Sequence, residues 1–239
     1  FISAAHGAGY PLNDDFNGED QEGVGYYQVT QKNGQRCSAA HAFLTPNLGR
    51  KNLTVITDAT VQKILMEGKK AVGICYLVKG NKQEIHCKKE VIISAGAFGS
   101  PQLLMLSGIG NEDKIAPHGI EYIHQLDGVG ENLQDHVDIM TVKHFRKTEL
   151  LAYRPKAMWW AVKQSVKYFT DRTGLLTSVV AEAGGFIKSD KSLETPDLQL
   201  HFIPAAMDDH GRNAKMLFNY GISLHACLLR PKSRGSVSL

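Results

Sequence analysis

The feature that most constrains the fold is an uncharged stretch of the sequence, VIISAGAFGSPQLLMLSGIG at residues 91–110. Its apolar, β-branched start at residues 91–94 predicts a buried strand. The glycines within residues 96–99 then predict a tight turn. Residues 100–101, Ser-Pro, are typical of a helix start, and Gly108 is well placed to end that helix. The stretch therefore predicts a strand, a glycine turn and a short helix, whose free N–H groups favour a polar or anionic ligand.

Other interpretations of this stretch compete with a ligand site. A membrane span is disfavoured, because four glycines, three serines, a proline and a glutamine would leave polar backbone unpaired in lipid. The spacing Gly96-x-x-Gly99 is not the full dinucleotide fingerprint, so an ordinary strand-to-helix connection is at least as compatible with it as a cofactor turn. The glycines could also serve helix packing alone, and spacing does not decide between these alternatives.

The composition of the chain narrows the class of protein. Hydrophobic residues make up 43% of 239 residues, which allows a sizeable core, and a net charge of +3 without a dense basic block weighs against nucleic acid as a partner. The four cysteines are scattered and form no C-x-x-C pair, so neither a metal site nor a disulfide framework is indicated and a reducing compartment is expected. The first residues lack a signal-peptide pattern, and both ends look cut, so we expect an internal segment of a longer protein.

The pattern along the chain predicts a mixed fold of the α+β or α/β class. Turn-separated strands at residues 53–56, 60–66, 71–79 and 83–87 form a predicted β-meander that leads into the opening stretch. Beyond residue 137 the sequence pattern changes from a β-meander to a mixture of helix and strands. A helix with both tryptophans in its expected core stripe is predicted at 157–170, with strands at 137–145, 198–203, 220–229 and 235–239.

The segment GAFGSPQLLMLSGIG, residues 96–110, resembles the second signature of the glucose–methanol–choline (GMC) oxidoreductases, which are FAD-dependent alcohol oxidases and dehydrogenases. Further stretches agree in order and spacing: DFNG at 15–18 with RCSAA at 36–40, VGENLQDH at 129–136, and RPKSRGSV at 230–237. The resemblance covers essentially the whole chain. It is closest to the choline dehydrogenase and aliphatic alcohol dehydrogenase branch.

The resemblance implies a division into segments of two domains. Residues 1–27 would belong to the substrate domain, residues 28–136 to the FAD-binding domain, and residues 137–239 to the substrate domain, built on a mainly antiparallel sheet flanked by helices. The family's G-x-G-x-x-G unit and its C-terminal histidine base are missing from these 239 residues. The isolated chain is therefore expected to be inactive and to bind FAD weakly or not at all.

The resemblance also assigns site residues. Toward the adenosine end of FAD and along the loop near the flavin it implies Val61, Ser94, Ala95, Gly96, Asn132, Asp135 and His136. For catalysis it implies that His201 faces the flavin ring, that Asp138 holds the cationic head of choline, and that Glu182 lines the same cavity. On residue type alone, His201 and Asp138 could equally be satisfied core or surface groups, and Asp135 could brace its loop.

The implied function of the parent protein is oxidation of a primary alcohol, choline or an aliphatic alcohol, to the aldehyde by hydride transfer to flavin. Its partners would be the small alcohol and an electron acceptor, a membrane quinone or another acceptor rather than oxygen. A cytoplasmic protein with peripheral contact at the inner membrane is the corresponding expectation. The alternative from a different class is a non-catalytic binding or interaction module that kept the substrate-domain sheet.

Overall fold

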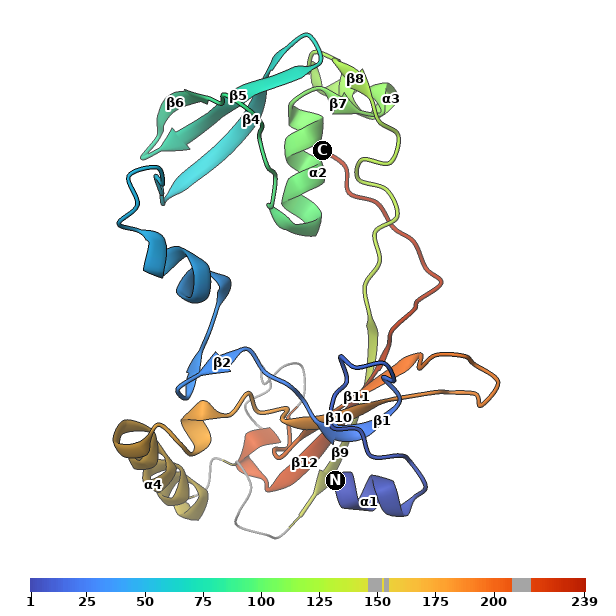
Figure 1. Cartoon of the computed structure of the whole chain (residues 1–239). Coiled ribbons are helices and arrows are strands. Elements are labelled where there is room, and N and C mark those ends of the chain that lie inside the picture. Colours follow the sequence, from blue (N-terminus) through green and yellow to red (C-terminus); the bar gives the residue numbers. More distant parts are fainter. Residues whose placement is uncertain (146–151, 153–154, 208–215) are drawn as a thin grey trace. The chain divides into compact units, whose positions relative to one another are not determined.

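A computed structural model describes residues 1–145, 152, 155–207 and 216–239 (Figure 1). The chain divides into two compact units. Unit 1 consists of Phe1–Gly49 and His136–Arg230, and unit 2 of Arg50–Asp135 and Pro231–Leu239. The predicted boundary near residue 137 lies beside this division, whereas residues 28–49 pack with unit 1 and residues 231–239 with unit 2. The functional roles of the predicted domains stay predictions.

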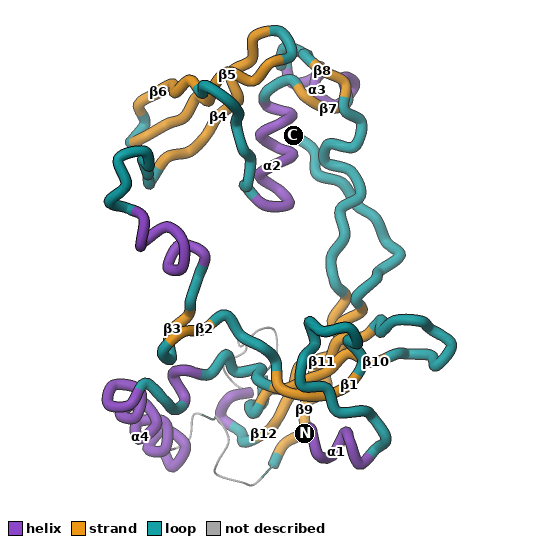
Figure 2. The backbone as a smooth tube through the Cα atoms, viewed as in Figure 1, coloured by secondary structure: helices purple, strands orange, loops and turns teal. Residues whose placement is uncertain are grey.

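The main feature of unit 1 is a five-stranded antiparallel sheet with the order β1-β10-β11-β12-β9 (Figures 1 and 2). The predictions at 137–145, 198–203 and 220–229 are confirmed as β9, β11 and β12. No strand was predicted at β10, because its sequence AGGFI holds two glycines, which have low strand propensity. The strands are β1 (Gly23–Tyr26), β9 (Val137–His144), β10 (Ala183–Ile187), β11 (Leu198–Ile203) and β12 (Gly221–Leu228).

Short helices and a small hairpin complete unit 1. The hairpin turn at Asn33 and Gly34 has positive φ at both residues, as an Asn-Gly turn requires. Helix α4 (Pro155–Asp171) confirms the helix predicted at 157–170, but its apolar stripe is not in the core, since Trp159 is 64% exposed. The remaining elements are α1 (Ile2–Gly7), β2 (Gln31–Lys32), β3 (Gln35–Arg36), η1 (Ala40–Leu44), η2 (Thr45–Asn47), η4 (Leu175–Thr177) and η6 (Met216–Phe218).

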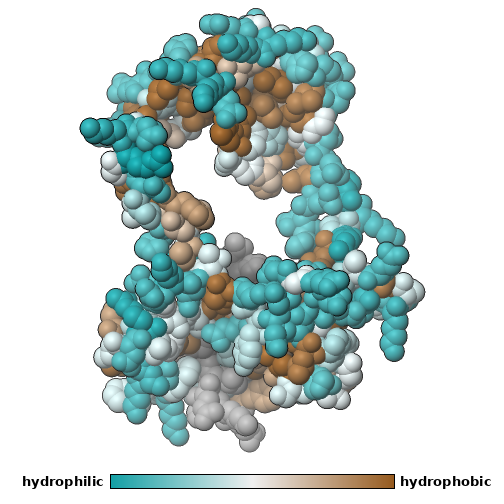
Figure 3. Space-filling model, viewed as in Figure 1, coloured by the Kyte–Doolittle hydropathy of each residue, from teal (hydrophilic) through white to brown (hydrophobic). Residues whose placement is uncertain are grey.

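Unit 2 is a three-stranded meander with helix α2 packed against its first strand (Figure 2). Three of the predicted meander strands are confirmed, and Gly68 and Gly80 take positive φ in the two turns that join them. Hydrophobic side chains gather around α2 and the strands beside it (Figure 3). The elements are β4 (Ala59–Glu67), β5 (Lys70–Val78), β6 (Asn81–His86), α2 (Gly96–Leu106), β7 (Ile109–Gly110), α3 (Glu112–Ile115), η3 (Ala116–His118) and β8 (His124–Gln125).

The opening stretch differs from its prediction in two respects. Residues 91–95 form no strand, because no strand in the described part of the chain pairs with them, and β-branched residues alone do not make a ladder. Helix α2 begins at Gly96 rather than at residue 100, so the glycines occupy its first turn. Its end is as predicted, since α2 stops at Leu106 and Gly108 follows with φ of 77°.

Two other predicted strands are also wrong. Residues 53–56 form no strand, and within residues 235–239 only Gly235 makes an isolated bridge, to Leu133. Both segments have the alternating apolar pattern of a strand but lack a neighbouring strand in the described structure. Pairing is a tertiary property, so a short apolar run does not determine it.

Candidate functional site

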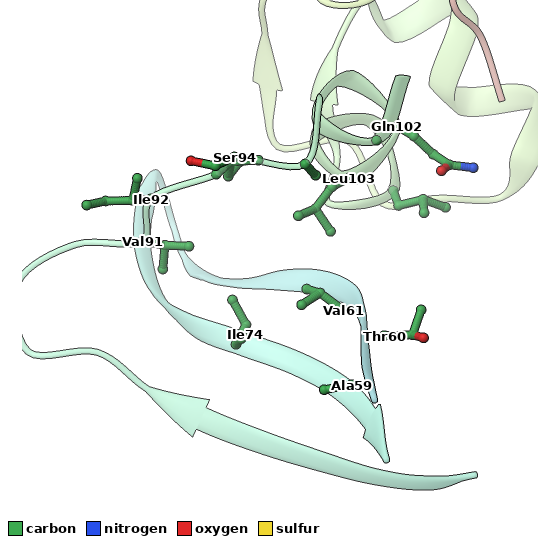
Figure 4. Close-up of a pocket in the computed structure, with 13 residues that line it drawn as sticks. Ala59, Thr60, Val61, Ile74, Val91, Ile92, Ser94, Gln102 and Leu103 are labelled. Atoms are coloured by element: carbon green, nitrogen blue, oxygen red, sulfur yellow. The ribbon is translucent and has the colours of Figure 1, made fainter. Parts of the chain in front are cut away.

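A groove in unit 2 lies between β4, the extended segment 91–95 and α2 (Figure 4). Its volume is about 480 Å³. Three of the predicted cofactor residues line it together, Val61 from β4 and Ser94 and Ala95 from the extended segment. Gly96 follows directly as the first residue of α2. The structure therefore brings the four residues expected at the adenosine end to one place.

The walls of this groove suit a flat, mainly apolar ring system. Figure 4 shows Val61 and Ile74 on the strand side and Leu103 extending from α2. Ser94 and Gln102 add polar groups to the same lining. Sites for small ligands are typically apolar with a few placed polar groups. The lining thus fits an adenine-like ring better than a phosphate.

Ser107 fixes the position of α2 against β4, and it was missed by sequence reasoning. Its hydroxyl accepts a hydrogen bond from the Ile64 N–H at 2.8 Å and donates to the Leu103 carbonyl at 2.6 Å. Ser107 is only 5% exposed. Because β4 is an edge strand, this hydroxyl satisfies a backbone donor that no neighbouring strand takes. In the sequence, the serine looks like an ordinary residue of a helix end.

The other predicted cofactor residues lie elsewhere. Asn132 lines a second groove of unit 2, which runs along α2 beside Ala97, Leu104 and Val129. Asn132 has a φ of 61°, an uncommon conformation for a residue other than glycine. Asp135 and His136 are exposed and stand where the chain passes from unit 2 to unit 1.

A polar cluster lies on one face of the sheet in unit 1. His201 on β11 is directly opposite His225 on β12, and Cys227 is directly opposite Asp138 on β9. Residues two apart on a strand share a face, so the four side chains form two adjacent rows. His225 Nδ1 is 2.7 Å from Asp138 Oδ2, and the Cys227 thiol donates to Asp138 Oδ1 at 3.5 Å.

His225, like Cys227, is a member of this cluster that sequence reasoning left out. It is 8% exposed, and its Nε2 has no hydrogen-bond partner among the described residues. The sequence does carry a weak signal for it. In the alternating segment Ser-Leu-His-Ala-Cys, residues 223–227, His225 and Cys227 fall on one face.

Burial and the neighbouring charges shift the pKa values of two members of the cluster, His201 and Cys227. Burial lowers the pKa of His201 below the usual value, while the nearby Asp138 carboxylate opposes that shift and His225 and His136 add to it. Burial, followed by the charge of Asp138, raises the pKa of Cys227 to about 11. At neutral pH His201 is therefore a neutral imidazole, and Cys227 is a thiol that can donate to Asp138.

The three predicted catalytic residues do not all meet. His201 and Asp138 share the face of the cluster, and the two oxygens of Asp138 contact His225 and Cys227. Glu182 lines a pocket with Tyr26 and Phe202, and Phe202 alternates with His201 on β11. That pocket therefore lies toward the other face of the sheet. The role of Asp138 toward a cation stays a prediction.

Among the described residues, no group of three or more His, Cys, Asp or Glu side chains could hold a metal ion. None of the helices in the described ranges is both long and apolar enough to cross a membrane.

Comparison with known proteins gives matches along the whole chain. A family model described as GMC oxidoreductase matches residues 1–138. Across the whole chain, 45% of residues are identical to an alcohol dehydrogenase [acceptor] of Pseudomonas putida, and 40% to an oxygen-dependent choline dehydrogenase of Pectobacterium carotovorum. The chain spans 43% and 42% of the lengths of these two relatives.

Solved structures give the same fold. The chain matches pyridoxine 4-oxidase from Mesorbium loti with a TM-score of 0.80 and 25% identity, over all of this chain and 42% of that one. Formate oxidase matches with a TM-score of 0.79 and 24% identity, over 97% of this chain and 44% of that one. At such identities the second likeness concerns the fold alone.

Proposed function

Because this chain belongs to the GMC oxidoreductase family, we propose that it forms part of an FAD-dependent enzyme that oxidises a primary alcohol to the aldehyde. The observation that carries this proposal is 45% identity along the full chain to an alcohol dehydrogenase [acceptor]. Choline and aliphatic alcohols are the proposed substrate classes, since choline dehydrogenases are also 40% identical over the full chain.

Unit 2 would hold the adenosine part of FAD in the groove between β4 and α2. The groove has apolar walls at Val61, Ile74 and Leu103 and small residues where a ring would enter, so its residues fit that group. When bound, FAD supplies the flavin that accepts the hydride. Residues 28–136 would then act mainly as the cofactor domain.

Unit 1 would bind the alcohol substrate. His201 is half-buried and neutral at physiological pH, so its one ring N–H can donate a hydrogen bond to the hydroxyl oxygen and stabilise the charge that develops when the proton leaves. Asp138 keeps a partly exposed carboxylate beside it, which supports attraction of a quaternary ammonium group. Residues 1–27 and 137–239 would thus serve the substrate. Glu182 has no part in this proposal, because its pocket lies toward the other face of the sheet.

The direct test measures flavin and turnover in the protein of full family length that carries this chain. We expect a flavin spectrum near stoichiometry and reduction of an artificial acceptor that depends on choline or on a medium-chain alcohol. A non-catalytic module would show neither. Loss of both readouts in a folded preparation would refute the proposal.

Filling the adenosine groove should weaken cofactor binding. Ala95→Trp places an indole in the groove beside Val61 and Ser94, and we expect the Kd for FAD to rise by about tenfold or more, equivalent to about 1.4 kcal/mol. The measurement is a flavin fluorescence titration of the apoprotein. Phe98→Trp is the control, because Phe98 is 67% exposed and is not among the residues that line this groove. Equal affinities for the two variants would place the adenosine elsewhere.

We further propose that the electron acceptor is a membrane quinone and that the protein is peripheral to the inner membrane. Helix α4 supports this proposal, because an apolar stripe on it is exposed while Ala157, at 2% exposure, lies on its packed side. Lys163 sits beside the stripe, 5.8 Å from the centre of the Trp159 ring. Such a helix suits an anionic lipid surface. The stripe consists of Met158, Trp159, Val162, Val166 and Phe169, which are 53% to 74% exposed.

The prediction for α4 concerns vesicle binding. The double variant Trp159→Glu with Phe169→Glu should bind phosphatidylglycerol vesicles at least about tenfold more weakly than the unsubstituted protein in a flotation assay, because each aromatic side chain contributes on the order of 1–2 kcal/mol on burial. Thr170→Glu adds a charge at an exposed polar position of the same helix and serves as the control. If the double variant and the control float alike, α4 does not contact lipid.

A further inference from the structure

Tyr27 follows β1 directly and reaches across β10 to β11. Its hydroxyl donates to the Leu200 carbonyl and accepts from the Gly185 N–H at 3.2 Å, with Gln199 Nε2 at 3.5 Å. Its own N–H donates to the Glu182 carbonyl at 2.8 Å. A phenol has one donor and two acceptor positions, so this hydroxyl is fully used. The hydroxyl of Tyr27 is therefore fixed to β11, which carries His201, and its backbone to the residue that precedes β10.

The ring of Tyr27 contacts the imidazole of His201. The ring centroids are 5.4 Å apart, and the planes are tilted by 36°. On its other sides the Tyr27 ring meets Phe16 at 5.3 Å and Phe186 at 6.2 Å. Burial raises the pKa of the Tyr27 phenol, so the hydroxyl stays protonated and keeps its donor bond at neutral pH.

Glycine at position 184 makes this contact possible. A β-carbon at Gly184 would collide with the Tyr27 hydroxyl and with the Leu200 carbonyl oxygen. The space above β10 that a side chain would fill is thus occupied by the tyrosine ring. This accounts for a glycine at position 184, in a strand where glycine is otherwise unfavourable.

His201 is also held from the β12 side. His225 lies directly opposite it, is 8% exposed, and is anchored by the 2.7 Å contact of its Nδ1 with Asp138. Cross-strand neighbours on one face have Cβ atoms roughly 5 Å apart, so an immobile His225 restricts the rotamers of His201. His201 therefore stands between a fixed phenol ring and a fixed imidazole.

We infer that Tyr27 is a positioning residue for His201, which sets the direction of its imidazole toward the alcohol through the Leu200 hydrogen bond and the ring contact. The catalytic role of the His201 imidazole in this inference rests on the proposed function. The orientation of that imidazole by Tyr27 is a property of unit 1 alone. The groups that face His201 are Tyr27, the Asp138–His225 pair and His136.

The test compares Tyr27→Phe with Tyr26→Phe by NMR of the full 239-residue chain labelled at histidine. Tyr26 is the neighbouring residue and is 70% exposed, so the control loses the same hydroxyl from an exposed position. We expect Tyr27→Phe to shift the His201 ring signals and to move its titration midpoint upward, because looser packing admits water where burial had lowered the pKa. Tyr26→Phe should leave both unchanged. His201 signals that are identical in the two variants would overturn the inference.

Two further measurements separate the possible failures. In the unsubstituted 239-residue chain, we expect nuclear Overhauser contacts between the ring protons of Tyr27 and those of His201. Their absence would overturn the inference even if the variant does not fold. In the flavin-loaded enzyme of full family length, Tyr27→Phe should lower kcat by about tenfold with a smaller change in KM. If the parent enzyme oxidises no alcohol, the proposed function fails, while the NMR result still decides the placement of His201.

Discussion

Replacing His201 with alanine is expected to lower kcat/KM for the alcohol by about 100-fold to 1000-fold, the usual cost of removing one hydrogen bond to a developing oxyanion. The physical reason is the position of the imidazole. It is half-buried and neutral, and burial makes a hydrogen bond from it stronger than in water. Bound flavin should stay near stoichiometry, because His201 belongs to unit 1 and the adenosine groove to unit 2. Steady-state kinetics with an artificial acceptor, together with the flavin spectrum, measure both effects.

The matched control for this prediction is His144→Ala. His144 lies on β9 of the same sheet and is exposed, so its loss removes an imidazole without touching the polar cluster. We expect its kcat/KM to stay within about twofold of the parent enzyme. Equal activities for His201→Ala and His144→Ala would show that His201 makes no contact with the reacting alcohol. An intermediate value for His201→Gln, which keeps one donor, would support the hydrogen-bonding role.

The parts of the fold that sequence predicted well are those with strong local signals. The meander strands β4, β5 and β6 are bounded by turns whose glycines, Gly68 and Gly80, need positive φ. Strands β9, β11 and β12 have the composition of half-buried strands. Prediction failed where the formation of a strand depends on a second segment of the chain that pairs with it. Residues 91–94 resemble a strand in composition, yet pairing is decided by a second segment that local sequence does not specify.

The candidate site residues that could be predicted are those that the family resemblance assigned. Val61, Ser94 and Ala95 do lie together in one groove, and His201 and Asp138 do share a sheet face. The supporting residues were not predictable in the same way. His225 and Tyr27 matter because of strand register and of contacts between residues more than 80 positions apart. A periodicity of two places a side chain on a face, but it does not say which residue of the next strand stands opposite.

Helix α2 illustrates the same distinction on a smaller scale. Its apolar residues at 103–106 indicate a buried helix, and its end at Gly108 follows from glycine chemistry. The two grooves along it could not be foreseen, because they depend on how α2 lies against β4 and on the loop that carries Asn132. Ser107 decides the first of these by bonding to Ile64. The structural role of Ser107 thus depends on its tertiary contact with Ile64, which the local sequence pattern does not indicate.

Met105→Ala is expected to destabilise unit 2 by about 2–5 kcal/mol, the range for deleting a fully buried methionine side chain. Met105 is 1% exposed and packs against Ile115 and Val129, so truncation leaves a cavity that three separate chain segments would have to close. Urea unfolding of the chain, followed by the exchange of amide hydrogens in α2, measures the loss.

The neighbouring Leu106 provides the comparison, because it lies on the same turn of α2 but is 37% exposed and lines the adenosine groove. Leu106→Ala should cost no more than about 1 kcal/mol, while it changes the groove directly. Met105→Ala acts in the opposite manner, since it leaves the groove lining intact and loosens the helix that carries it. Equal stabilities for the two variants would mean that Met105, Ile115 and Val129 do not form the core that holds α2. If the two stabilities differ as expected, helix α2 is held in place by the Met105, Ile115 and Val129 core, on the side away from the adenosine groove.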